Sequence, residues 1–584
     1  MKRLVQVLSF FLLMAILASC AGTSGGNTAT SQQTTALTTQ RQETQTSAIE
    51  PSATNQSKYD VTPDERKAIL DANLAELEFD AFAELYPEDL FPITSEKVTM
   101  TMGMVRGAIN GNMSEMSLIR KLGALANIDI QCIDIPATSR TETLNLMLAS
   151  GEELPHCFWG VNVFSDNDIV TYGASGTFLD FMQYIDVMPI LQGIMKKCEW
   201  QFEVCKTSNG ALYTLPYIEQ QDGNTSVASI HFINGRWLDN LGLEIPSTTD
   251  EYVEVLRAFR DQDANKNGNN SDEIPLTSHV GDTQKAFSYL YGAFGSRDNK
   301  DHYEVKDGIV ASTANTNEYK NAIIWMRSLY EDNLIDNEAF TQDGASFNAR
   351  ANQDGGIYGA FVCWRASAFM SRENADTYIP VPPLTGPDGY RMWSRENSME
   401  CIKNAFVMTK DAPEPELVAR FADACYNEYI SVETNWGPFG IIQNLDENNQ
   451  WAADDTIVPD NYNFSEWRDY NRSKGPAACL NEYYETFCAW DFNALYRTGI
   501  LKDIYFPLYP DEFYPPLYFS VEDSNRLNTI ETQYRNYVNE MEAKWISAGG
   551  IEDEWESYLA NLENIGLSEA LSIRQKYYDD TYNK

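Results

Sequence analysis

An acidic and amide-rich stretch at residues 261–273, DQDANKNGNNSDE, has residue types and spacing that could bind a metal ion. Oxygen-bearing side chains alternate there and Gly268 provides a sharp turn, which matches positions 1, 3, 5 and 6 of an EF-hand loop. Position 12 is Ile274, so a polar turn without metal is the alternative. Because calcium needs six or more oxygen ligands, we expect it to be bound by Asp263, Asn265, Asn267, Asn269, Asp272 and Glu273.

The sequence lacks the common motifs of catalytic sites. The chain has no His-Glu-x-x-His zinc pattern and no Walker phosphate loop. Its four histidines are isolated from one another in the sequence: His156, His231, His279 and His302. We therefore expect no catalytic residues and no enzyme. A glycosidase or lyase remains the alternative, because two carboxylates suffice for glycoside hydrolysis and acidic residues abound.

The first twenty residues have the layout of a secretory signal. Lys2 and Arg3 precede an apolar run over residues 4–17, which is shorter than the ~20 residues that a membrane-spanning helix needs. The following residues 17–22, LASCAG, resemble the bacterial lipobox. We expect residues 1–20 to be a lipoprotein signal peptide that ends at Cys20, whose thiol carries the lipid. An ordinary signal with an incidental cysteine is the alternative.

Residues 21–58 are rich in Ser, Thr and Gln and contain no aromatic side chain before the end of the stretch. Such a composition cannot bury enough apolar area to offset its ordering entropy, so we expect a disordered linker. The remaining chain far exceeds the roughly 250–300 residues that one hydrophobic core supports, which predicts two or more lobes.

The net charge and the cysteine content exclude two classes of partner, nucleic acids and zinc bound by Cys-x-x-Cys pairs. Acidic residues number 85 against 43 basic ones, and the net charge of −42 would repel a nucleic acid. Besides Cys20 the chain has nine cysteines without a Cys-x-x-Cys pair, so a zinc site of that spacing is excluded. Nine is odd, so a complete disulfide framework is impossible, and we expect several of them to be small buried apolar residues.

The order of predicted elements indicates an α/β fold. Residues 97–105, 127–135 and 156–159 read as strands, and residues 114–126 and 138–149 between them read as helices. This alternation is typical of a parallel sheet. A second block begins with a strand at 227–234, and residues 248–251 form a capping box that opens another helix.

Several segments match a known family in order and spacing. They are TLNLMLASG at 143–151, LYTLPY at 212–217, PSTTDEY at 246–252, DEIPL at 272–276 and EWESY at 554–558. On these segments the chain resembles the extracellular solute-binding proteins of ABC importers, the class of maltose-binding protein, and more closely their long Gram-positive lipoprotein branch. Similar loops bind calcium in that family, although the loop here is about one residue longer.

The resemblance implies a two-lobed periplasmic-binding-protein-like fold of type II, with the ligand in a cleft between the lobes. It places lobe 1 at 97–229 and 392–447, and lobe 2 at 230–391 and 448–584. The third connection between the lobes cannot be located well from the sequence. Residues 59–96 are a departure from the family and are predicted to be a helical N-terminal extension of unassigned role.

Five aromatic residues lie in loops or just after predicted strands, where cleft residues of this fold belong. Aromatic rings can cover the apolar faces of sugars, and Trp364 occupies a place similar to a sugar-stacking tryptophan of maltose-binding protein. Core packing is the alternative for each ring. The candidate ligand-binding residues are Trp159, Tyr217, Trp364, Trp393 and Trp436.

The resemblance implies a membrane-anchored, extracellular and monomeric binding protein that delivers its ligand to ABC transporter permease subunits. An oligosaccharide is the favoured solute, by family analogy and by the aromatic residues. A peptide or other small molecule, or a surface lipoprotein that adheres to glycans, remains the alternative.

Overall fold

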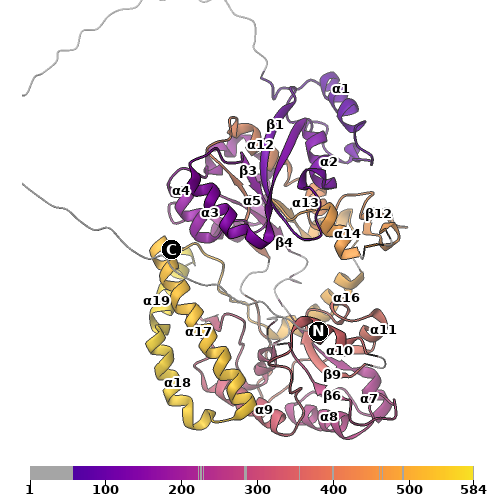
Figure 1. Cartoon of the computed structure of the whole chain (residues 1–584), viewed down its shortest axis with the longest axis vertical. Coiled ribbons are helices and arrows are strands. Elements are labelled where there is room, and N and C mark those ends of the chain that lie inside the picture. Colours follow the sequence, from indigo (N-terminus) through magenta and orange to yellow (C-terminus); the bar gives the residue numbers. More distant parts are fainter. Residues whose placement is uncertain are drawn as a thin grey trace, which may run out of the picture. The chain divides into compact units, whose positions relative to one another are not determined.

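A computed structural model of the protein describes residues 57–582, except for 221–222, 224–226, 228, 280, 282–285, 354–355, 397–399, 460, 463 and 490–491. The predicted signal peptide, Cys20 and all but two residues of the predicted linker lie outside these described residues. Within the described part, no helix is long and apolar enough to cross a membrane. Two larger sheets, each with its own helices, form the centres of this part of the chain, and two two-stranded sheets accompany them (Figure 1).

A six-stranded sheet with the order β14-β4-β11-β3-β1-β2 forms the centre of what we call lobe 1. Every strand runs in the same direction except β11, which is antiparallel to its neighbours β3 and β4. The strands are β1 (Val98–Arg106), β2 (Ile128–Pro136), β3 (Cys157–Trp159), β4 (Leu215–Glu219), β11 (Cys401–Met408) and β14 (Ala477–Cys479).

The first helices and strands of lobe 1 have the hydrophobic periodicity from which they were predicted. In α2 the buried residues include Ile119, Leu122 and Leu125, which recur at helical spacing. The edge strand β2 alternates buried and exposed residues, because one face lies against helices. The lobe 1 helices are α2 (Ser117–Ala126), α3 (Arg140–Ser150), α4 (Asp166–Ala174), α5 (Pro189–Lys197), α6 (Glu199–Cys205), α12 (Pro415–Ala424) and α13 (Glu428–Trp436).

The N-terminal extension is part of the lobe 1 core. Its one α-helix, α1 (Pro63–Leu74), begins with a capping box formed by Thr62 and Glu65 and packs on α2. Beyond a short turn at Ala83–Leu85 the rest of 75–96 is not helical, so the prediction of a helical extension is right for α1 and wrong for that stretch. Tyr86 and Phe91 are buried in the core of lobe 1.

A four-stranded sheet with the order β10-β5-β9-β6 forms the centre of lobe 2. Strand β5 is antiparallel to both neighbours, and β6 is parallel to β9. All residues of β5 and β9 are buried, so neither strand shows the alternation of a half-exposed sheet. The strands are β5 (Ile230–Asn234), β6 (Ile274–Leu276), β9 (Tyr358–Cys363) and β10 (Tyr378–Pro380).

Helices and a hairpin surround this second sheet. The predicted capping box at Thr248 and Glu251 is present and opens α8, whose buried face contains Tyr252, Leu256 and Phe259. The long α17 packs on α9, and α17, α18 and α19 lie side by side at the C-terminus (Figure 1). The elements are α7 (Gly235–Leu241), α8 (Thr249–Asp261), β7 (Tyr303–Lys306), β8 (Ile309–Ser312), α9 (Asn317–Glu331), α10 (Gly344–Ala351), α17 (Val521–Ala548), α18 (Ile551–Ile565) and α19 (Leu567–Tyr582).

The chain passes between the two sheets several times. The first passage lies between β4 and β5, and the return lies between β10 and β11, each near its predicted boundary. The predicted assignment of everything after 447 to lobe 2 differs from the structure, because β14 pairs with β4 and Trp451 lies in the lobe 1 core. A third passage therefore follows β14 and leads to α16 (Phe492–Ile500), a fourth returns to Tyr514 and Leu517 in the lobe 1 core, and a fifth leads into α17.

Candidate ligand-binding site

The carboxyl ends of the parallel strands of lobe 1 share one edge of the sheet, where ligands of open α/β sheets bind. Trp159 ends β3, Arg106 ends β1 and Glu219 ends β4. The register pairs Trp159 with Met104, which lies two residues before Arg106. Trp159 and Arg106 therefore both lie near this edge of the sheet. We call this edge the lobe 1 rim.

Four polar groups meet at the end of β4. The Glu219 carboxylate accepts hydrogen bonds from the Tyr217 hydroxyl at 2.8 Å, the Asn435 side-chain amide at 2.9 Å and the Lys474 ammonium at 3.2 Å. Burial by itself raises the pKa of Glu219, but Lys474 and the two hydrogen bonds outweigh burial and hold the pKa below its usual value. The carboxylate is therefore ionised and fixed, and the Lys474 ammonium lies 4.5 Å from the centre of the Tyr217 ring.

The segment 472–475 covers Trp159 and thereby positions Lys474. The Trp159 indole N–H donates to the backbone oxygen of Ser473 at 3.1 Å. Gly475 lies directly against the indole, so that a Cβ at this position would overlap the ring. Trp159 and Tyr217 are consequently 0 % and 1 % exposed. Both predicted residues contact this segment, Trp159 through Ser473 and Gly475 and Tyr217 through Lys474, and both are buried.

Partly exposed aromatic rings lie beside this segment. Trp436, at the end of α13, donates its indole N–H to the Tyr484 hydroxyl at 2.9 Å, and the Arg468 guanidinium lies 5.9 Å from its ring. In α14 (Phe464–Asn471) the rings of Trp467 and Tyr470 are nearly parallel, with centroids 5.7 Å apart. All three rings are partly exposed.

Sequence reasoning missed Trp467 and Tyr470 because they were assigned to the other lobe. Helix α14 contacts the loop after β1, where the Asn110 side chain donates to the backbone oxygen of Asp469 at 2.8 Å. A pair of aromatic residues three positions apart before a basic, glycine-containing segment is the signal that could have indicated them.

Three cations near the lobe 1 rim have carboxylate partners within the protein, whereas Arg140, at the start of α3, donates to the backbone oxygen of Asn162 at 3.2 Å. Lys474 pairs with Glu219 at 3.2 Å, Arg472 with Asp469 at 2.8 Å, and Arg468 also contacts Asp469. To pair with Lys474, Arg472 or Arg468, an anionic ligand would have to compete with these internal carboxylates. The electrostatics of the lobe 1 rim therefore favour an uncharged ligand.

In lobe 2 the predicted residue Trp364 directly follows β9 and is partly exposed. The Arg497 guanidinium stacks on its ring, 3.6 Å from the centroid, and Arg497 Nε donates to the Trp364 backbone oxygen at 3.0 Å. Burial lowers the pKa of Arg497 to about 9, which still leaves the side chain charged at neutral pH.

Trp393 lies in the segment that returns to lobe 1 and is 1 % exposed. Its indole N–H donates to the backbone oxygen of Ser229 at 3.1 Å, so it joins the return segment to the first passage. Its ring packs between Tyr289 and Tyr505 in the lobe 2 core. Trp364 and Trp436 are thus the two predicted rings with exposed surface, whereas Trp159, Tyr217 and Trp393 are buried beneath other residues.

The predicted calcium loop has its oxygens arranged around one turn. Gly268 and Lys266 have positive φ, and Asp263 accepts from the backbone N–H groups of Asn267 at 3.0 Å and Gly268 at 2.9 Å. Among the described residues, Asp272 Oδ1 and Glu273 Oε2 are buried without a hydrogen-bond partner. Burial, reinforced by Asp272, raises the pKa of Glu273.

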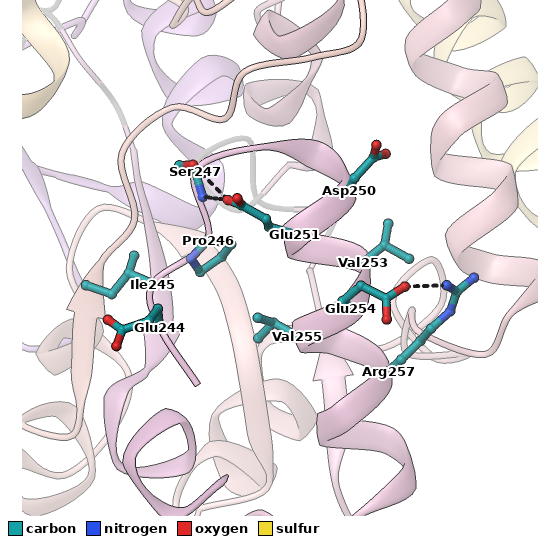
Figure 2. A pocket seen from close by; sticks show the side chains of 10 residues that line it. All are labelled: Glu244, Ile245, Pro246, Ser247, Asp250, Glu251, Val253, Glu254, Val255 and Arg257. Atoms are coloured by element: carbon teal, nitrogen blue, oxygen red, sulfur yellow. Dashed lines mark hydrogen bonds and ion pairs between the residues drawn. The ribbon is translucent and has the colours of Figure 1, made fainter. Parts of the chain in front are cut away.

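One depression in lobe 2 is lined by none of the rim residues or the predicted rings. It has a volume of about 850 Å³ and is open to solvent along the start of α8 (Figure 2). Two of its four acidic groups are held by neighbours: Glu251 accepts from Ser247, and Glu254 pairs with Arg257 at 2.8 Å. None of its lining residues is a predicted site residue, and we assign no ligand to it.

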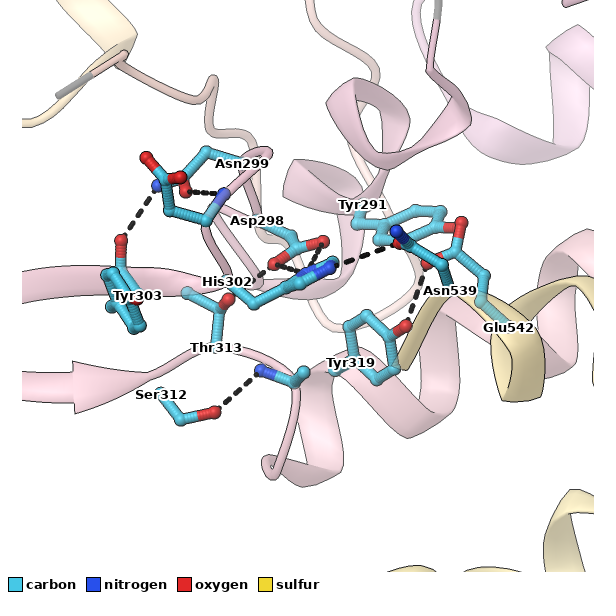
Figure 3. Close-up of polar contacts among 12 residues, drawn as sticks. Tyr291, Asp298, Asn299, His302, Tyr303, Ser312, Thr313, Tyr319, Asn539 and Glu542 are labelled. Carbon is cyan, nitrogen blue, oxygen red and sulfur yellow. Dashed lines mark hydrogen bonds and ion pairs between the residues drawn. The ribbon is translucent and has the colours of Figure 1, made fainter. Parts of the chain in front are cut away.

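The histidines do not form a catalytic arrangement with an exposed nucleophile. His231 is buried against Tyr252, and burial lowers its pKa to about 3. His302 pairs with Asp298 at 3.0 Å, but Thr313 donates to Asp298 instead of to the histidine (Figure 3). His302 is 4 % exposed, so a substrate cannot reach it.

Comparisons with known proteins are decisive for the family. No family model matches the chain. The fructooligosaccharide ABC transporter substrate-binding protein FusA of Streptococcus pneumoniae is 32% identical over 499 residues, which covers 84% of this chain and 91% of that protein. This chain belongs to the substrate-binding proteins of ABC transporters.

Solved structures agree with this assignment. The S. pneumoniae FusA complex with kestose has a TM-score of 0.73 at 31% identity, and it covers 83% of this substrate-binding protein and 100% of the solved chain. An HMO-binding, ABC-transporter-associated solute-binding protein from Bifidobacterium longum infantis has a TM-score of 0.71 at 24% identity over 84% of this chain and 99% of the solved chain, which supports the fold alone. The predicted family and two-lobed fold are confirmed, and the family consists of binding proteins, as the prediction of a non-enzyme requires.

A third relative differs in its ligand. The polygalacturonan/rhamnogalacturonan-binding protein YtcQ of Bacillus subtilis is 25% identical over 358 residues, which covers 59% of this chain and 66% of that protein. The family therefore includes members named for neutral and for acidic sugars, and the five predicted ligand contacts of this substrate-binding protein stay predictions.

Proposed function

We propose that this substrate-binding protein captures a neutral oligosaccharide outside the cell and delivers it to the permease of an ABC transporter. The observation that carries the proposal is the pairing of rim cations with internal carboxylates, above all Lys474 with Glu219 at 3.2 Å. A uronate ligand needs cations that are free to pair with it. The 32% identity to a fructooligosaccharide-binding relative supports the same class of ligand.

The rings with exposed surface are the proposed sugar contacts. Trp364 in lobe 2 and Trp436 in lobe 1 remain from the predicted set, and Trp467 and Tyr470 join them. The buried Trp159, Tyr217 and Trp393 do not contact the sugar themselves. They fix the segments that carry polar groups. Fixed rings can stack on the apolar faces of a sugar, while the partly exposed Lys474 ammonium offers donors to its hydroxyls.

Calcium is proposed as a structural ion in the loop 263–273. The unpartnered oxygens of Asp272 and Glu273 fit a hard cation, because a buried carboxylate oxygen without a partner is costly. Asp263, Asn265, Asn267 and the Asn269 carbonyl would complete the ligands. A solved FusA structure described as an EF-hand mutant supports a loop of this kind in the relative.

The proposed anchor is a lipid on Cys20. The lipobox-like residues 17–22 support this, and two acyl chains provide the affinity that stable anchoring needs. A chain with Cys20→Ala should be released into the medium. Its retention in the membrane fraction would contradict the anchor without affecting the proposed ligand. The proposed monomer is likewise open to a direct measurement of mass in solution.

The proposed contacts are tested by titrating the purified chain with kestose while its tryptophan emission is recorded. Trp364→Ala and Trp467→Ala should each weaken binding by about tenfold, by analogy with stacking of a base on an aromatic ring. Trp325→Ala, in α9, is the matched control and should bind as the unchanged chain does. Equal affinities in all three variants would contradict these contacts.

A further inference from the structure

Arg497 is charged, yet it is only 2 % exposed. It lies on α16, just after the third passage from lobe 1 to lobe 2. Its guanidinium lies 3.6 Å from the centre of the Trp364 ring, so one face of the indole is covered. Trp364 nevertheless stays partly exposed, so part of the indole remains free for another partner.

The same guanidinium connects three segments of the chain. Arg497 Nε donates to the backbone oxygen of Trp364 at 3.0 Å, just after β9. Arg497 Nη2 donates to the backbone oxygen of Val227, in the first passage between the sheets. One side chain on the third passage thus fixes both the ring that ends β9 and a residue of the first passage.

The chemistry of this contact requires arginine. A guanidinium is planar, stacks on an aromatic face and still directs N–H donors outward in its own plane. Lysine would retain the charge but could not stack as a plane while donating to two carbonyls. Burial lowers the pKa of Arg497 to about 9, so the group remains a cation at neutral pH in spite of its low exposure.

We propose that Arg497 is the positioning residue for Trp364: it holds the indole with one face covered and the remaining surface available to the sugar. Through Val227 it also links the orientation of the ring to the first passage between the two sheets. This inference rests on the proposed function, because it assumes that Trp364 contacts the sugar.

A double-mutant cycle on kestose affinity tests the proposal. Arg497→Lys should weaken binding about tenfold, as expected for loss of a desolvated stack. Trp364→Ala should weaken binding by a similar factor, and the double variant should be no weaker than Trp364→Ala alone, because Arg497 acts through that ring. Emission from the unliganded chain should also change in Arg497→Lys, since the environment of Trp364 is altered.

Arg574→Lys is the matched control. Arg574 is also a buried arginine stacked on aromatic rings, 4.4 Å from Tyr303, and it pairs with Glu531 at 2.7 Å. Its replacement should lower the melting temperature and leave kestose affinity unchanged. Arg497→Gln, which retains a planar side chain with N–H donors, is a second variant that should bind more weakly than the unchanged chain.

Four other results of these experiments would contradict the proposal. The positioning role would be overturned if the fold losses of kestose affinity in the two single variants multiplied in the double variant. Unchanged affinity in Arg497→Lys would also overturn it. If neither Arg497 variant folds while Arg574→Lys does, Arg497 is a structural residue and the proposal fails. If Trp364→Ala binds kestose as the unchanged chain does, the ligand contact of the proposed function fails, and the positioning role fails with it.

Discussion

The Trp159 indole N–H donates to the backbone oxygen of Ser473, 314 residues later in the chain, at 3.1 Å. This bond holds the segment 472–475 across the end of β3. Gly475 completes the contact because it has no side chain where the indole lies. The segment in turn places Lys474 on Glu219, so a buried tryptophan determines the position of a polar group on the lobe 1 rim.

Gly475→Ala should therefore displace the segment. We expect a loss of about 1–3 kcal/mol in the free energy of unfolding, because the added methyl overlaps the Trp159 ring. Urea denaturation measures the loss. The matched control is Gly193→Ala in α5, where a Cβ meets no atom within 4 Å and the helix should gain about 0.5–1 kcal/mol. Equal midpoints for the two variants would show that the segment is not held in this way.

The N-terminal extension should be required for the stability of lobe 1. The Tyr86 hydroxyl donates to the buried Glu433 carboxylate at 2.8 Å, and Lys121 pairs with the same carboxylate at 2.6 Å. Tyr86→Phe should cost about 1.5–3 kcal/mol, the value of a hydrogen bond to a charged group. Tyr390→Phe is the control, because Tyr390 is 38 % exposed.

Denaturation of both tyrosine variants should show the loss in Tyr86→Phe alone. Deletion of residues 57–96 should have a larger effect, since it uncovers the core where Tyr86 and Phe91 lie. A deleted chain that melts at the original temperature would mean that the extension is dispensable.

The sequence predicted those elements whose hydrophobic period is visible. Strand β2 alternates because one of its faces packs on helices and the other is exposed, and α8 has a capping box and one apolar face. Strand β14 is only Ala477–Cys479, three small buried residues without a period, so its place beside β4 could not be predicted. The boundary error at 447 follows from this one strand.

The candidate site was harder to predict than the fold because burial depends on distant residues. Trp159 ends a strand and Trp364 follows one, yet Trp159 is covered by the segment 472–475 while Trp364 keeps exposed surface. Their sequence contexts are alike. The contact of Lys474 with Glu219 joins residues 255 positions apart, and no local pattern indicates it.

His302 should make stability depend on pH above neutrality. Burial by itself lowers its pKa, but Asp298, at 3.0 Å, and Glu542 outweigh burial and raise the pKa to about 9 (Figure 3). A histidine pKa raised on folding stabilises the fold fully below about pH 6.5, and this contribution is lost as pH rises through about 9. It amounts to at most about 3 kcal/mol.

Urea denaturation at pH 6, 7.5 and 9 should thus show a falling free energy of unfolding in the unchanged chain. The free energy of unfolding of His302→Gln should be lower at pH 6 and should change less between pH 6 and pH 9. The side chains that face His302, Asp298 and Asn539, remain in both proteins. Parallel pH profiles would mean that His302 does not carry the charge in the folded state.

Chelation of calcium should lower the melting temperature, because an ion that binds the folded state alone stabilises it by mass action. Asp263→Ala should abolish the dependence on calcium. Asp446→Ala is the control, since Asp446 accepts backbone N–H groups in a similar polar turn, from Asn448 at 2.8 Å and Gln450 at 2.9 Å. Identical melting curves with calcium and with chelator would contradict the proposed site.

The central claim is capture of a neutral oligosaccharide. Calorimetric titration of the purified chain with kestose, and with a galacturonate oligomer of equal length, tests it most directly. We expect saturable binding of one kestose per chain and none of the galacturonate, because Lys474 and Arg472 on the lobe 1 rim already have carboxylate partners. Saturable binding of the galacturonate, with none of kestose, would contradict the account.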